Sequence, residues 1–190
     1  MWGAIVVAVF LGLVAAGCDH PRIDATNAAA EAAWKELAHA YLAEASAARD
    51  LAEQIKMYLP AEQIVARSLE EASKGLRDTD YEHLDTTSAA PFQNLDRWHR
   101  IVVAQARLLE TYRQKYPLLS EEETFAAIIQ RIGDACRDTD AAIERYREAA
   151  IAYNRALRTF PESVVNNMFL KRKPRAILRI DRGANAVRRP

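Results

Sequence analysis

In two of the predicted helices a histidine lies three positions after an acidic residue, which is the spacing of ligand pairs on a metal-binding helix. Glu36 precedes His39, and Asp96 precedes His99. Residues three apart share one helix face, and helical di-iron centres combine two Glu-x-x-His pairs with two further inward-facing glutamates. One candidate function is therefore a helical-bundle metal-binding protein or enzyme that uses Glu36/His39 and Asp96/His99.

The competing interpretation places both pairs on solvated helix faces. No histidine of the chain belongs to an H-E-x-x-H or C-x-x-C metal motif. His99 directly follows Trp98, which the helical pattern assigns to the core, so the imidazole is expected to point elsewhere. We therefore predict no bound metal and no cofactor, and the two pairs remain the second candidate.

Other chemistry finds little support in the composition. Six glycines, three of them among the first 17 residues, are too few for a glycine-rich phosphate loop. No serine stands in a nucleophile-elbow motif, and Cys136 has no histidine near it in the sequence. We predict that the chain is not an enzyme. We also predict no nucleic-acid partner, because the basic C-terminal region has Phe169 as its single aromatic residue.

The N-terminal residues resemble the signal of a bacterial lipoprotein. Residues 2–16 carry no charge, which is typical of the apolar part of a signal peptide, and the following Ala-Gly-Cys18 resembles a lipobox. There the cysteine sulfur receives diacylglycerol, the signal is cleaved, and the new amine is acylated by a fatty acid such as palmitate. Cys18 is thus the predicted lipidation site and residues 1–17 the signal peptide. The alternative is an uncleaved single-span anchor.

Either anchor predicts a location at the cell membrane, with the bulk of the chain on the exoplasmic or periplasmic side. Asp19 directly follows Cys18 and resembles the inner-membrane retention signal of Gram-negative lipoproteins. The predicted partners are the membrane, through the N-terminus, and an unidentified protein of the cell envelope.

Long helices must position all of these residues. Residues 27–59 are mostly strong helix formers, and the pattern resumes over 61–75 after Pro60. A polar connection at 78–91 precedes a helix that ends at Pro117 and another that ends at Pro161. We predict an all-α fold, an elongated antiparallel bundle of three to four long helices. Residues 18–26 are the predicted linker and 27–161 the bundle domain.

The last predicted helix carries an apolar stripe that alternates steps of four and three for five heptads, from Phe125 to Phe160. Such stripes are buried on neighbouring helices or on another subunit, so a homo-oligomer is a further possibility. The predicted aromatic core consists of Trp34, Tyr41, Trp98, Tyr112, Phe125, Tyr146, Tyr153 and Phe160.

Positive charge is concentrated at the C-terminus. After Phe160 the chain has eight basic and two acidic residues, which predicts a basic, partly disordered tail over 162–190. Two interpretations apply to its apolar part: residues 164–169 cover one end of the bundle, or residues 168–170 rest on anionic lipid. The predicted membrane-contact residues are Lys171, Arg172 and Lys173.

The chain has a Tyr116-Pro117-Leu118 turn and a fixed spacing from Tyr153-Asn154 to Phe160-Pro161, and Arg49-Asp50-Leu51 stands in the first long helix. In these features the chain resembles the LemA family of bacterial membrane-associated helical proteins, most strongly over residues 108–174. The resemblance implies an N-terminal hydrophobic anchor and long antiparallel helices, and it carries over no catalytic residue. The expected function is that of a membrane-anchored scaffold or interaction protein of the cell envelope.

Overall fold

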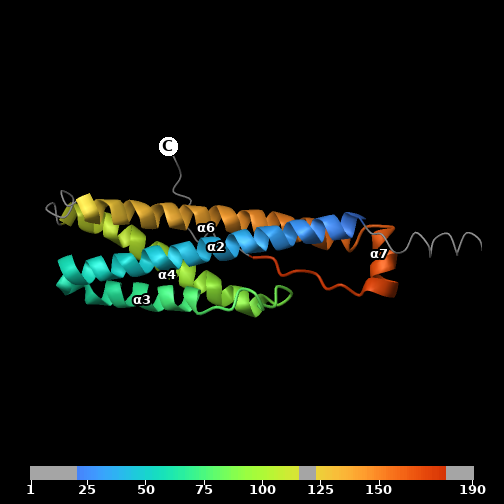
Figure 1. Ribbon diagram of the computed structural model, residues 1–190, viewed down its shortest axis with the longest axis horizontal. Coiled ribbons are helices and arrows are strands. Elements are labelled where there is room, and N and C mark those ends of the chain that lie inside the picture. Colours follow the sequence, from blue (N-terminus) through green and yellow to red (C-terminus); the bar gives the residue numbers. More distant parts are fainter. Residues whose placement is uncertain (1–20, 116–122, 179–190) are drawn as a thin grey trace, which may run out of the picture.

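The computed structural model describes residues 21–115 and 123–178, with the side chains of Glu110 and of residues 112–115 left aside. Figure 1 shows a rod of long helices, each antiparallel to its neighbours. Within the described residues there is no strand. The all-α, elongated antiparallel bundle that the sequence predicts is therefore confirmed.

Helix α2 (Pro21–Tyr58) runs the full length of the rod. Proline suits the first helical position because its missing N–H would have no helical partner there. The helix begins six residues before the expected start at 27, so Pro21–Thr26 is helical rather than linker. The large apolar residues at helical spacing are buried, as predicted: Trp34, Leu37, Tyr41, Leu51 and Ile55.

A short 3-10 turn, η2 (Pro60–Glu62), reverses the chain into α3 (Gln63–Arg77). Helix α4 (Ala89–Lys115) follows the connection 78–88. A Cβ atom on Gly75 would lie 2.3 Å from Cε2 of Trp98, so the absence of a side chain lets the indole pack directly on α3. The sequence pattern predicted Trp98 in the core, but its side chain is half-buried in this contact. The neighbouring His99 is buried instead.

Helix α6 (Glu123–Ala156) lies along α2 and contacts it far more extensively than it contacts α4. Its predicted stripe is buried from Phe125 to Leu157, with Ile129 half-buried. Phe160 lies beyond the helix and is exposed, so its assignment to the core was wrong. The helix ends at Ala156, and the chain turns before it reaches Phe160.

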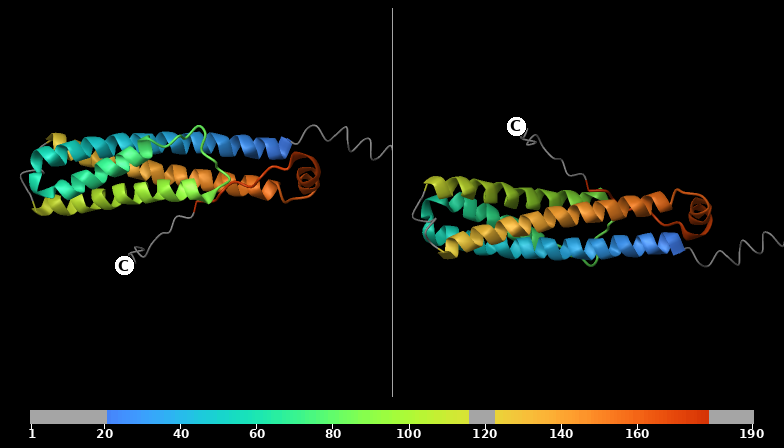
Figure 2. Two further views of the ribbon diagram at one scale, coloured as in Figure 1. Left: turned by 90° about the horizontal axis from the view of Figure 1, so that it is seen from below. Right: turned by 90° about the horizontal axis from the view of Figure 1, so that it is seen from above.

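Residues 171–178 return along the rod and pack against it (Figure 2). Asn154 binds both backbone groups of Arg175: its Nδ2 donates to the carbonyl oxygen, and its Oδ1 accepts from the amide, each at 2.8 Å. The Arg175 guanidinium donates to Asn27 and Thr86 and lies over the Tyr153 ring. This part of the expected tail is therefore a docked segment of the fold.

Helix α7 (Glu162–Val165) and the π-helical turn η3 (Asn166–Leu170) lie across the end of the rod where α2 begins (Figures 1 and 2). Ion pairs join α7 and the residues just after η3 to α2: Arg22 with Glu162 at 3.8 Å, and Arg172 with Asp24 at 2.8 Å. The side chain of Leu170 packs against a small cluster around Ile23 and Tyr153. We call residues 160–173 the end cap.

Candidate functional site

The most unusual polar group of the described bundle is a buried histidine between two carboxylates. His99 on α4 has Nδ1 at 2.9 Å from Oε2 of Glu44 on α2, and its Nε2 lies 3.2 Å from Oδ1 of Asp140 on α6. His99 is 5 % exposed and Glu44 is fully buried, whereas the Asp140 carboxylate faces solvent. One imidazole therefore links three helices.

The electrostatics of this cluster favour the imidazolium form. Burial by itself lowers the pKa of His99, because it penalises the charged ring. Hydrogen bonds to Asp140 and Glu44, together with the charges of both carboxylates, outweigh that effect and raise the pKa to about 9. At neutral pH both ring nitrogens then carry hydrogens and both donate to a carboxylate, so the ring compensates the buried charge of Glu44.

A doubly donating imidazolium has no lone pair to bind a metal or accept a proton. The structure also separates the two pairs that suggested a metal centre. Glu36 and His39 are exposed, and Oε2 of Glu36 lies 3.0 Å from Nε of Arg145. Asp96 pairs with Arg100 on its own helix. Over residues 21–115 and 123–178, no group of three or more His, Cys, Asp or Glu side chains is arranged to hold a metal ion.

His99 was considered as a ligand in the sequence, but its partners were missed. The expectation that it points away from the core because it follows Trp98 was wrong. The pattern assigned Trp98 to the core, yet the buried face of α4 passes through Phe92, Leu95, His99 and Val102. A polar residue at a core position of this stripe, together with Glu44 within the buried face of α2, was the available signal.

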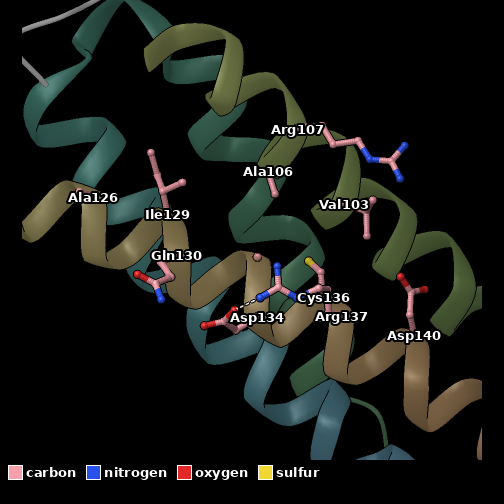
Figure 3. A pocket seen from close by; sticks show the side chains of 11 residues that line it. Val103, Ala106, Arg107, Ala126, Ile129, Gln130, Asp134, Cys136, Arg137 and Asp140 are labelled. Carbon is pink, nitrogen blue, oxygen red and sulfur yellow. Dashed lines mark hydrogen bonds and ion pairs between the residues drawn. The ribbon is translucent and has the colours of Figure 1, made fainter. Parts of the chain in front are cut away.

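A groove of about 620 Å³ opens between α4 and α6 (Figure 3). Cys136 lies in it with its sulfur toward α4, between Ala106 and Val103 of that helix and the exposed Arg137 of its own. Burial raises the pKa of the Cys136 thiol, and the charges of Glu44 and Asp140 raise it further. Cys136 is a buried free cysteine whose thiol therefore stays protonated and is a poor nucleophile.

Asp140 lines this groove and also accepts the hydrogen bond from His99, so the two features meet at one carboxylate. The groove has mixed apolar and charged walls, with Arg107 and Arg137 on opposite sides and Arg137 paired with Asp134. This arrangement offers a surface for contact with another molecule and no activated nucleophile.

The predicted membrane-contact residues lie at the end cap. Lys171 and Lys173 are exposed, whereas Arg172 is half-buried and pairs with Asp24. The predicted lipidation site, Cys18, and the apolar residues before it lie outside the described residues. None of the helices in the described part of the chain is long and apolar enough to cross a bilayer.

Comparison with known proteins decides the family. The LemA family profile matches residues 33–188, which is most of the chain. The protein belongs to the LemA family. No curated protein and no solved structure matches the sequence. The match runs from within α2 to beyond α6, so in this LemA family member α2, α3 and α4 belong to the same unit as α6.

The Tyr153-Asn154 pair, part of the resemblance to the LemA family, has a structural role in this chain. Tyr153 packs beneath the Arg175 guanidinium, and Asn154 holds the backbone of the same residue. The pair thus ties the returning C-terminal segment to α6.

Proposed function

We propose that the protein is a membrane-anchored helical scaffold or interaction protein of the cell envelope, held to the membrane through Cys18 or through the apolar residues before it. The observation that carries the proposal is the use of His99. The group that most resembles a catalytic centre donates from both nitrogens to carboxylates of two other helices, and so it serves to join the bundle.

The apolar N-terminal sequence supports the anchor. Residues 2–16 carry no charge, and α2 begins only three residues after Cys18. A diacylated and N-acylated cysteine would attach more than one chain to the bilayer, which is what stable anchoring requires. The rod would then present its helical faces, including the α4–α6 groove, to an envelope protein.

Mass spectrometry of the protein purified from membranes tests the anchor, with membrane fractionation of Cys18→Ser and Cys136→Ser as the paired variants. We expect an acylated N-terminal Cys18 in the parent and in Cys136→Ser, and loss of the acylated form in Cys18→Ser. If the purified protein has an intact Met1 and an unmodified Cys18, lipidation is excluded and the uncleaved anchor is the correct alternative. Recovery of the unmodified parent chain in the soluble fraction would overturn the proposal.

Elemental analysis of the purified protein distinguishes the metal-binding or enzymatic alternative from the scaffold. A stoichiometric metal that is lost in His99→Gln would favour it over a scaffold. Light scattering in detergent measures whether the chain is a monomer or a homo-oligomer, and cross-linking in intact membranes identifies what the rod touches.

A further inference from the structure

The end cap carries large apolar side chains on its outer surface. Phe160 is 78 % exposed and Phe169 is 67 % exposed, and Val164 and Met168 are exposed beside them. Leu170 in the same segment faces inward, against the Ile23 cluster. The cap therefore has an inner face that attaches it to the bundle and an outer face with four exposed apolar side chains.

Polar contacts hold this cap in place. Asn166 is buried, and its side chain donates to the carbonyl oxygen of Arg172 and accepts from the Arg172 amide at 2.9 Å. Lys171 adopts a positive φ of 49°, which closes the turn. The Arg172–Asp24 and Arg22–Glu162 ion pairs join the cap to the first turns of α2. The outer apolar face is thus presented on a fixed support.

The cap lies at the end of the rod where α2 begins, and the proposed anchor directly precedes α2 in the sequence. Cys18 is three residues from Pro21, and three extended residues span at most about 11 Å. Residues 17–20, which would connect an uncleaved anchor, span at most about 18 Å to Pro21. With either anchor, the first turn of α2 and the cap that is ion-paired to it are held close to the lipid surface.

Charge distinguishes this end from the opposite one. Residues 155–173 contain five basic side chains and one acidic side chain, whereas residues 53–71 around the Pro60 turn contain two basic and four acidic. The opposite end also has an exposed aliphatic residue, Ile64, at 79 % exposure. Both segments therefore expose apolar surface, and of these two described segments the cap is the one that combines it with the positive charge that anionic lipid attracts.

We propose that the end cap is a second membrane contact, in which Phe160, Val164, Met168 and Phe169 enter the interface of an anionic bilayer while Lys171 and Lys173 meet its head groups. The inference rests on the proposed anchor, which brings the cap to the bilayer. It adds that the bundle is seated on the membrane by its end and does not swing freely on a tether. Amphipathic surfaces of this kind bind through buried apolar area together with attraction to anionic lipid.

The test uses the full chain, purified from membranes and reconstituted into vesicles of phosphatidylcholine with or without phosphatidylglycerol. Phe169→Cys and Ile64→Cys, each combined with Cys136→Ala, are labelled with a polarity-sensitive fluorophore. The Cys136→Ala parent reports any label on Cys18. Both labelled positions are highly exposed, so the folded bundle tolerates them equally. Spin-labelled lipid serves as the quencher.

On phosphatidylglycerol vesicles we expect the emission of the label at 169 to shift to the blue and to be quenched by spin-labelled lipid. The emission of the label at 64 should stay that of a fluorophore in water. Lys171→Gln with Lys173→Gln should lower the ratio of inserted to free cap by up to about 30-fold, since each basic residue contributes about 1 kcal/mol at an anionic surface. High salt should act in the same direction.

Three other outcomes overturn the inference. If the protein floats with the vesicles but positions 169 and 64 both report water, the cap contact is wrong and the anchor stands. If the protein does not float with vesicles, the proposed anchor fails and the inference fails with it. If position 169 is shielded without lipid quenching, and in proportion to protein concentration, the cap binds a second copy of the chain.

Discussion

Nδ1 of His99 lies 2.9 Å from Oε2 of Glu44, although the two residues are 55 positions apart and belong to different helices. Glu44 is fully buried, and a buried carboxylate needs both a counter-charge and hydrogen bonds. His99 supplies both, and its other nitrogen reaches Asp140 on a third helix. This contact fixes the register of α2, α4 and α6 relative to one another.

Removal of either buried partner should destabilise the bundle strongly. In His99→Gln the Glu44 carboxylate stays buried without a counter-charge, and we expect a loss of about 3 kcal/mol in the free energy of unfolding. Urea unfolding followed by circular dichroism measures it. The matched control is His83→Gln, because His83 forms an exposed pair with Asp80 at 3.0 Å and should change stability by less than about 0.5 kcal/mol. Equal effects of the two substitutions would contradict the structural role of His99.

The stabilisation by His99 should also depend on pH. Its pKa is about 9 in the folded chain and has an ordinary value of 6.5. The folded state therefore binds the proton more tightly, and the contribution is complete below pH 6.5 and is lost as the pH rises through about 9. We expect the difference in unfolding free energy between the parent and His99→Gln to decline across this range by a few kcal/mol. A difference that stays constant from pH 6 to 9.5 would argue against a charged His99.

Gly75 and Gly133 should respond in opposite directions to alanine. A Cβ on Gly75 would meet the Trp98 indole at 2.3 Å, whereas a Cβ on Gly133 has no neighbour within 4 Å. Gly75→Ala should lower stability by about 1–3 kcal/mol because the indole must move, and Gly133→Ala should raise it by up to about 1 kcal/mol through helix propensity. Thermal unfolding of both variants checks this. A stabilising Gly75→Ala would mean that the indole does not pack on α3.

The docking of residues 171–178 should depend on Asn154. Asn154→Ala removes both hydrogen bonds to the backbone of Arg175, and we expect exchange of the Arg175 and Ala176 amides to accelerate by at least about tenfold, since a hydrogen bond in a partly buried site contributes about 1–2 kcal/mol. Hydrogen exchange read by mass spectrometry measures it. Asn167→Ala, at an exposed position of η3, is the control. Unchanged exchange in Asn154→Ala would show that Arg175 holds the segment by its side chain alone.

The long helices could be predicted because their apolar spacing is a local property. The stripe that begins in α6 is buried from Phe125 through Leu157, except at the half-buried Ile129, as its heptads indicate. The pattern failed at Phe160, since periodicity does not report that the chain turns after Ala156. The pattern also placed Trp98 and not His99 on the core face of its helix. It could not show that Gly75, on another helix, makes room for the Trp98 indole outside the core.

The polar contacts between distant segments could not be predicted in the same way. The partners of His99 are 55 and 41 residues away, and helical spacing says nothing about which side chains face each other across helices. The returning segment likewise has no periodicity, because Asn154 and the Arg175 guanidinium hold it rather than an apolar stripe. Composition therefore indicated a free tail where specific hydrogen bonds make a docked one.

Helix α2 has no glycine, and no proline after Pro21, over its 38 residues. At 1.5 Å per residue it separates the end cap from the Pro60 turn by about 57 Å. A bundle seated on lipid by its cap would hold that turn at a set height above the head groups. The protein would then act as a spacer, and a partner that contacts the Pro60 turn would meet it at that height and not at the lipid surface.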